Sequence, residues 1–264
     1  MSNIFKNLHS KSDFFILGNC WDLLSAKIHE NLGYEAIGTS SWAMSSLKGL
    51  NDGEQLSFEY LLSTAESIVN AVNIPVSIDI EKGYSDNENK IIENVLKLAD
   101  IGCSGINIED SNFDGTLKKS KDFSNLIQNL KNKLDNNNYK DFVINARTDV
   151  YLTDHLQVKT DESILRGREY HEAGADCLFI PGLSKINEIN EISHKTDIPL
   201  NILALPNLTD KKQLAEAGVN RLSFGNSLFD NILSYSEETI MKYLNENKIA
   251  TVYDHPSLKT NFPI

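Results

Sequence analysis

The sequence is short of cysteine, of positive charge and of long apolar runs. Its three cysteines, Cys20, Cys103 and Cys177, are far apart and form no CxxC pair. A disulfide framework or a zinc finger is therefore not expected, and reduced thiols in a cytoplasmic protein are. No stretch approaches the roughly 18 apolar residues that a membrane-spanning helix needs, and the first residues hold no apolar signal-peptide core. We expect a cytoplasmic protein with no membrane partner.

Positive charge is outweighed by negative charge, with 25 Lys and Arg against 37 Asp and Glu and a formal net charge of −12. This excess of acid argues against binding to the phosphate backbone of nucleic acid. A small anionic substrate remains compatible with it, because one arginine and a metal ion can supply local positive charge. The hydrophobic fraction of 41% is enough for a substantial core.

A unit made of a helix, a glycine and a short apolar strand recurs along the chain. Glycine directly after a helix favours the left-handed backbone that ends the helix. Strand candidates, each followed by a helical stretch, lie at 14–17, 36–39, 76–80, 105–108, 142–146, 177–180, 200–203 and 221–224. Strands that alternate with helices pair in parallel, and eight such units predict a closed (βα)8 TIM barrel of the α/β class. The alternative is an open doubly wound sheet, which would usually carry a glycine fingerprint after its first strand; none is present.

The length of 264 residues fits a single barrel domain over residues 1–264. We place the barrel at about 14–230 and a C-terminal helix and tail at about 231–264.

Three of the apolar strands end in charged residues. Asp79 and Glu81 close the third strand, on one face if side chains alternate; Glu109 closes the fourth and Arg147 the fifth. Asp52 lies in the long loop after the second strand. Active sites of such barrels lie at the C-terminal ends of the strands, so these groups should converge. Because the donors are oxygen atoms, they favour Mg²⁺ over zinc.

Other interpretations of these residues stay open. The carboxylates could form an ion-pair network with Arg147 and hold no metal. Asn107 and Asn145 share faces with Glu109 and Arg147, and hydrogen bonding to the carboxylates is the alternative for both and the preferred interpretation for Asn107. The planar fork of Arg147 suits a substrate carboxylate or phosphonate.

Five segments, taken together and in this order, resemble the isocitrate lyase/phosphoenolpyruvate mutase superfamily, which includes phosphonomutase-like and 2-methylisocitrate lyase-like proteins. They are residues 18–26, 38–41, 79–84, 105–110 and 145–149. The resemblance implies a (βα)8 barrel and a homo-oligomer, a tetramer or dimer, in which the last helix is often exchanged between subunits.

The resemblance also implies the composition of the site. Mg²⁺, with Mn²⁺ as an alternative, would be held by Asp79 and, mostly through water, by Asp52, Glu81 and Glu109. A small-molecule 2-oxo or 2-hydroxy acid would contact the metal and a set of residues expected to be Ser40, Ser41, Trp42, Asp79, Asn145 and Arg147. Asp52 and Arg147 are the expected catalytic residues, with Arg147 and the metal stabilising an enolate oxygen.

The loop at 110–120 contains neither Cys nor His, although the lyases of this superfamily carry a catalytic Cys there. Our leading hypothesis is a Mg²⁺-dependent lyase that cleaves a C–C bond through a metal-stabilised enolate, because decarboxylation needs no dedicated base. One alternative is a phosphonopyruvate mutase or hydrolase that acts on a P–C bond. Another is a non-catalytic barrel that binds oxo acids. Lys118 and Lys119 could close over an anionic substrate or could lie in solvent.

Overall fold

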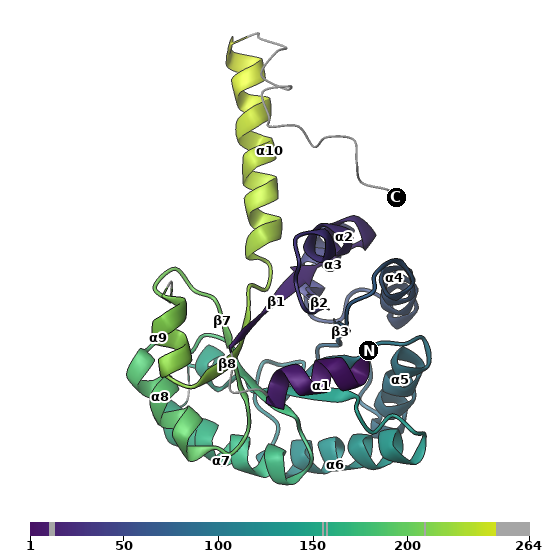
Figure 1. The fold of residues 1–264 in the computed structure, drawn as a ribbon, viewed down its shortest axis with the longest axis vertical. Helices are drawn as coiled ribbons and strands as arrows, with labels where there is room; N and C mark the ends of the chain where they lie inside the picture. Colours follow the sequence, from purple (N-terminus) through teal and green to yellow (C-terminus); the bar gives the residue numbers. More distant parts are fainter. Residues whose placement is uncertain (11–13, 155, 157, 209, 247–264) are drawn as a thin grey trace. The chain divides into compact units, whose positions relative to one another are not determined.

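The computed structural model describes residues 1–10, 14–154, 156, 158–208 and 210–246. In this part of the chain, parallel strands close into a barrel in sequence order (Figure 1). They are β1 (Phe15–Cys20), β2 (Ile37–Thr39), β3 (Val76–Asp79), β4 (Gly105–Glu109), β5 (Val143–Arg147), β6 (Cys177–Ile180), β7 (Leu200–Leu203) and β8 (Val219–Ser223). The predicted (βα)8 barrel is confirmed. The bounds of β6 and β7 are those predicted, whereas β1 continues to Cys20.

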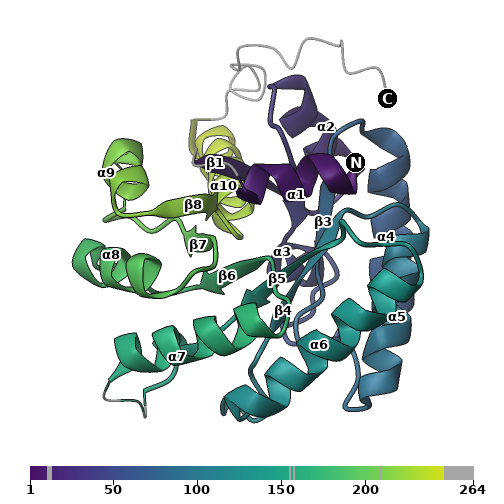
Figure 2. The same ribbon diagram turned by 60° about the horizontal axis from the view of Figure 1, so that its bottom comes forward.

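Helices cover the outside of the strands (Figure 2). Most of them begin at a side-chain cap, as Asp22 shows by accepting a hydrogen bond from the Ser25 N–H at 2.7 Å. They are α1 (Ser2–Ser10), α2 (Leu23–Asn31), α3 (Ser41–Ser46), α4 (Phe58–Ala71), α5 (Glu88–Asp100), α6 (Ser120–Asn136), α7 (Lys159–Glu172), α8 (Ile186–Lys195) and α9 (Lys211–Glu216), with a 3₁₀ turn η1 at Val150–Leu152.

The chain divides into two compact units, Met1–Gly225 and Asn226–Ile264. The first contains the barrel and every residue of the predicted site. The second contains α10 (Ser227–Glu246), and the tail predicted beyond it lies outside the described residues. The single domain over 1–264 stays a prediction. Within the described residues, no helix is both long and apolar enough to cross a membrane.

The three cysteines lie in the core, each fully or almost fully buried and none in a disulfide. Burial raises the pKa of each thiol to about 12. Since the thiolate is the reactive form of cysteine, these side chains act as small core residues rather than nucleophiles.

Helix α1 is an element that the strand pattern did not predict. Its residues Phe5 and Leu8 are buried with Phe15, Leu17 and Val143, which lie at or near the N-terminal ends of β1 and β5. Only a few apolar residues, separated by polar ones, make this contact. The sequence of this segment is therefore typical of an exposed region, and its burial follows only from the position of the barrel. The helix packs at the end of the barrel opposite the predicted site.

His9, at the end of α1, is buried and is predicted to make stability depend on pH. Its Nδ1 donates to the carbonyl of Phe5 at 2.8 Å, and its Nε2 faces the Arg221 guanidinium at 3.4 Å. Burial, and then the charge of Arg221, lowers the pKa of His9 from 6.5 to about 3. The neutral ring therefore favours the folded state, and this stability is lost as the pH falls below 6.5, where the unfolded chain takes up the proton.

Between pH 7 and pH 5, the free energy of unfolding of the parent should fall by about 2 kcal/mol more than that of a His9→Gln variant. Urea denaturation at the two pH values measures this difference. The matched control is His171→Gln, at an exposed position on α7, which should follow the parent. An equal pH slope for the His9 variant and the parent would contradict the assignment.

Candidate active site

The predicted acidic residues lie around the C-terminal ends of β3 and β4, but they do not all leave their strands in the same way. β3 ends at Asp79, and Glu81 lies in the turn that follows, with a positive φ of 49°. The expectation that Glu81 continues the strand on the face of Asp79 was therefore wrong. The turn, not strand alternation, points Glu81 back into the protein, where it is 3% exposed.

A relay of two asparagines orients Asp79. The Nδ2 of Asn145 donates to Oδ1 of Asn107 at 2.9 Å, and the Nδ2 of Asn107 donates to Oδ1 of Asp79 at 2.9 Å. The interpretation of Asn107 as a partner of a carboxylate is confirmed. Asn145 lies behind it and is fully buried, so its predicted contact with substrate stays a prediction.

The carboxylates of Glu81 and Glu54 bind backbone N–H groups of each other's loop segments. Oε2 of Glu81 accepts the Glu54 N–H at 2.9 Å, and Oε1 of Glu54 accepts the N–H groups of Lys82 at 2.9 Å and Tyr84 at 2.8 Å. Glu54, Glu81 and Tyr84 all adopt positive φ although none is glycine. Such strained backbone persists only where the surroundings fix it, and this reciprocal set of bonds fixes it. Glu54 was not predicted; its only signal is its place two residues after Asp52.

Glu109 pairs with two cationic side chains. Its Oε2 lies 3.0 Å from Nη1 of Arg147, and its Oε1 lies 3.4 Å from Nζ of Lys82 and accepts the Ser111 hydroxyl at 2.5 Å. Burial opposes ionisation of Glu109, but Arg147, Ser111 and Lys82 outweigh it and hold its pKa below the ordinary value. The ion-pair alternative thus describes Glu109. It does not extend to Asp52, Asp79 or Glu81, which form no ion pair with a basic side chain within the described residues.

Arg147 is fixed by a carboxylate on its own strand end. Nε of Arg147 donates to Oδ1 of Asp149 at 2.6 Å, and Nη2 donates to Oδ2 at 3.1 Å. These bonds and the contact with Glu109 use three of the five N–H groups of the guanidinium. Although burial opposes the positive charge, Glu109 and Asp149 raise the pKa of Arg147 above its ordinary value. The arginine is therefore a permanently charged donor held in one orientation.

Behind Asp149 lies a fully buried carboxylate, Asp110, whose role was not predicted. Its Oδ1 accepts the Asp149 N–H at 3.0 Å, while its Oδ2 accepts Arg166 at 2.9 Å and the Tyr170 hydroxyl at 2.6 Å. Arg166 and Tyr170 come from α7, 56 and 60 residues along the chain. Nothing near them in the sequence indicates this pairing, because it depends on the packing of α7 against the ends of β4 and β5.

The loop after β2 supplies the remaining predicted residues. Ser40 caps α3 by accepting the Ala43 N–H through its side chain, so Ser41 and Trp42 lie in the first turn of that helix. The Ser41 side chain lies close enough to Asp52 to favour the ionised form of its carboxyl group. The surrounding protein, and then the charge of Asp79, raises the pKa of Asp52. The influence of Asp79 on the pKa of Asp52 indicates that the loop after β2 brings Asp52 near the end of β3.

The acidic residues can accommodate a cation, although not as a dense cluster. Within the described residues, no three His, Cys, Asp or Glu side chains form a group that could hold a metal ion directly. Yet Oε1 of Glu81 is buried with no hydrogen-bond partner in that part of the chain. Burial, then the charges of Asp52 and Asp79, raises the pKa of Glu81 to about 8. One or two carboxylates with water in the remaining positions is how Mg²⁺ is commonly bound, and these residues fit it.

The barrel carries these charged residues at the end where enzymes of this fold have their active sites. Comparison with known proteins then gives the family. The phosphoenolpyruvate phosphomutase family model matches residues 5–244, and the chain belongs to this family. The predicted membership of the isocitrate lyase/phosphoenolpyruvate mutase superfamily, and with it the prediction of an enzyme, is confirmed.

Two proteins illustrate the sequence similarity of the chain to its relatives. An uncharacterized protein of Mycobacterium tuberculosis is 34% identical over 222 residues, which cover 84% of this chain and 81% of that protein. The oxaloacetate decarboxylase of Pseudomonas entomophila is 26% identical over 233 residues, covering 85% and 78%.

Two solved structures have the same fold. A provisionally assigned phosphonomutase from Burkholderia cenocepacia superposes with a TM-score of 0.86 at 30% identity, covering 91% of this chain and 98% of the other. A phosphonopyruvate hydrolase in complex with oxalate and Mg²⁺ superposes with a TM-score of 0.85 at 24% identity, covering 98% and 93%.

Proposed function

We propose that the chain is a Mg²⁺-dependent carbon–carbon lyase that acts on a small 2-oxo or 2-hydroxy carboxylic acid. The observation that carries this proposal is that a permanently charged Arg147, anchored by Asp149 and Glu109, lies at the same end of the barrel as Asp79, Glu81 and Asp52. Those three carboxylates form no ion pair in the part of the chain that the structure describes. The similarity to oxaloacetate decarboxylases over 85% of the chain supports cleavage of a C–C bond.

Each residue has a task that its contacts allow. Asp79, whose Oδ1 is held by Asn107, and Glu81, whose Oε1 has no hydrogen-bond partner among the described residues, would hold Mg²⁺, in part through water and together with Asp52. When bound, the ion supplies positive charge for a substrate oxygen that becomes electron-rich. Arg147 retains two N–H groups beyond those bound to Asp149 and Glu109, and these can bind a carboxylate or the same oxygen.

Cleavage of a 2-oxo diacid would then be a decarboxylation. Where a carboxylate is attached to the carbon next to the 2-oxo group, the bond between that carboxylate and its carbon breaks, the electron pair moves toward the 2-oxo oxygen, and CO₂ departs. A proton from solvent then restores the C–H bond of the product. No group on the loop after β4 needs to act as a base, which agrees with its lack of Cys and His.

Cleavage of a P–C bond is a second candidate, favoured by two observations. The matching family model is that of phosphoenolpyruvate phosphomutase, and the phosphonomutase neighbour at 30% identity covers 98% of its own chain. In that case Asp52, whose pKa is raised by burial and then by the charge of Asp79, would be the nucleophile or would orient the phosphonate.

We further propose that the protein is a homo-oligomer in which α10 contacts another subunit. Seven of its apolar side chains are at least 38% exposed; they are Leu228, Ile232, Leu233, Tyr235, Ile240, Met241 and Leu244. A helix with this many uncovered apolar residues is stable when a second surface covers it.

The function is tested by nuclear magnetic resonance of the full chain with Mg²⁺ and one acid at a time: oxaloacetate, 2-methylisocitrate, citramalate or phosphonopyruvate. We expect pyruvate to appear from a carbon acid and the ³¹P spectrum of phosphonopyruvate to stay constant. A changed ³¹P spectrum alone would favour the P–C reaction. Absence of turnover, with tight binding of oxalate, would favour an oxo-acid-binding protein without catalysis.

A further inference from the structure

Two buried polar atoms in the turn after β3 have no hydrogen-bond partner among the described residues. They are Oε1 of Glu81 and the hydroxyl oxygen of Tyr84. Buried polar groups are almost always hydrogen-bonded, so two exceptions in one turn point to a further group that binds there. Oε1 of a carboxylate accepts hydrogen bonds and a phenol hydroxyl can donate one. A single small group that does both can therefore satisfy the two atoms.

The hydroxyl of Tyr84 lies beside the acidic residues of the candidate site. Burial, and then the charge of Glu81 followed by that of Asp79, raises the pKa of Tyr84. Glu54 and Asp52 act in the same direction. The hydroxyl therefore keeps its proton and faces the carboxylates as a hydrogen-bond donor. Even so, no carboxylate in the described structure accepts that hydrogen bond.

The backbone of Tyr84 is held from two directions. Its N–H donates to Oε1 of Glu54 at 2.8 Å, and the carbonyl of the preceding Gly83 accepts Nδ2 of Asn94, on α5, at 3.1 Å. Tyr84 has a positive φ of 61°, which persists in a residue other than glycine only where the surroundings impose it. Its ring packs edge to face on Phe58 of α4, with 5.8 Å between the ring centres. The fold thus fixes the hydroxyl without using it.

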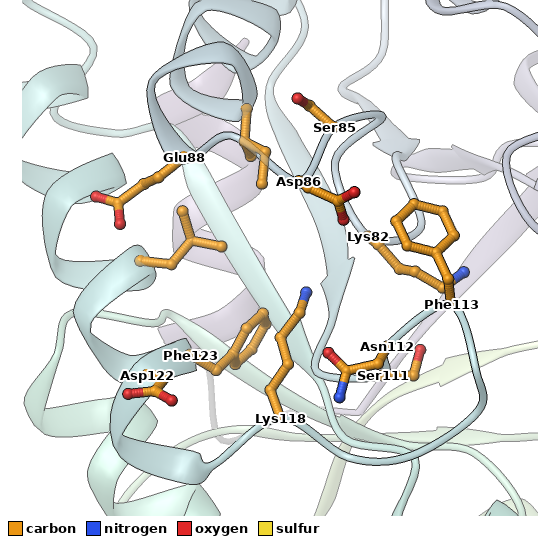
Figure 3. A pocket seen from close by; sticks show the side chains of 12 residues that line it. Lys82, Ser85, Asp86, Glu88, Ser111, Asn112, Phe113, Lys118, Asp122 and Phe123 are labelled. Atoms are coloured by element: carbon orange, nitrogen blue, oxygen red, sulfur yellow. The ribbon is translucent and has the colours of Figure 1, made fainter.

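The neighbours of Tyr84 in the sequence face a different space. Lys82 and Ser85 line a cavity of about 250 Å³ at the first turns of α5 and α6 (Figure 3). Tyr84, which lies between them in the sequence, does not line this cavity, and neither does any of the three carboxylates proposed to hold Mg²⁺. The Tyr84 side chain therefore belongs with the acidic residues whose charges act on it.

We propose that Tyr84 is a positioning residue of the proposed Mg²⁺ site, where its hydroxyl donates a hydrogen bond to a water molecule that Glu81 also binds. The inference rests on the proposed function, because this water belongs to the shell of the ion. Mg²⁺ keeps several of its waters when it binds to proteins, and the groups that orient metal ligands strongly affect metal affinity. Tyr84 acts on the ion through this water and does not contact the substrate.

Metal titration and thermal unfolding of a Tyr84→Phe variant of the full chain test the inference together. Phenylalanine keeps the ring beside Phe58 and removes only the hydroxyl. Titration with Mn²⁺, followed by electron paramagnetic resonance of the free ion, should show binding about tenfold weaker than in the parent, as loss of a partner of a metal ligand gives. In the presence of a chelator, the variant should melt at the temperature of the parent or above it, because it no longer buries a hydroxyl without a partner.

Tyr139→Phe is the matched control. The hydroxyl of Tyr139, which precedes β5, donates to Asp100, so its removal should lower the melting temperature and leave the affinity for Mn²⁺ unchanged. If the parent binds Mn²⁺ and Tyr84→Phe binds it equally well, the inference is overturned and the proposed function stands. A lower melting temperature of Tyr84→Phe in chelator would show that the hydroxyl stabilises the fold itself, and would also overturn the inference. If the parent binds no Mn²⁺, the proposed function fails and the inference fails with it.

Discussion

Asp79→Ala is expected to abolish Mg²⁺-dependent binding of oxalate. Asp79 is the carboxylate at the end of β3 that is oriented by Asn107 and is not consumed by an ion pair with a basic side chain in the described structure. Loss of a group that merely orients a metal ligand costs about 10- to 100-fold in affinity, so loss of the ligand itself should exceed about 100-fold. Calorimetry with and without Mg²⁺ measures the change.

Two further variants make this result specific. Asp79→Asn can still accept the Asn107 hydrogen bond through its amide oxygen, so it preserves the local geometry while it removes the charge. It should lose binding nearly as completely as the alanine variant. Glu66→Ala removes an exposed carboxylate from α4 and should bind like the parent. Unchanged oxalate affinity in Asp79→Ala would refute the metal assignment.

Arg147→Met should lower kcat/KM about 10²- to 10³-fold, the usual effect of removing one preorganised donor to a developing oxyanion. It should also lower the free energy of unfolding by about 2 kcal/mol, because Glu109, which is 5% exposed, then loses a charged partner in a buried place. Turnover assays on the substrate identified by resonance, together with urea denaturation, measure both effects.

Arg147→Lys separates the two roles of this residue. A lysine restores a positive charge near Glu109 and should recover most of the lost stability. It cannot reproduce the planar fork that donates to Asp149 and Glu109 while it keeps two further N–H groups, so activity should stay low. Near-parental kcat/KM in this lysine variant would show that Arg147 contributes only charge.

Much of the fold could be predicted because local sequence and global topology agree. Strand and helix signals alternate with short connections, and such a succession has few solutions other than a closed barrel. Helix α1 escaped prediction because its burial depends on contacts between Phe5 and the ends of strands more than a hundred residues away, such as β5. The end of β3 at Asp79 was missed because Glu81 adopts a left-handed backbone although it is not glycine.

The sequence indicated which residues belong to the site better than it indicated which of them form ion pairs or hydrogen bonds with one another. Asp79 and Glu109 could be predicted because they are acidic residues at the ends of apolar strands. A buried charge is costly unless it is paired or bound to a metal ion. Which charge neutralises which is set by distances across the barrel, and the sequence leaves that open. Lys82 sits beside the predicted Glu81, yet its contact with Glu109 joins the ends of two strands and follows only from the pairing of β3 with β4.

The hydrogen bonds that the Glu54 and Glu81 carboxylates make limit which loops of this enzyme could be exchanged during evolution. They tie the segment after β2 to the turn after β3, so neither can be exchanged with a relative's counterpart alone. The tip of the next loop, residues 112–117, bonds mainly within itself, through Asn112 and Thr116. A chimaera that replaces only this tip should keep the fold and the acidic strand ends intact, which makes it a natural module for recombination between relatives that process different acids.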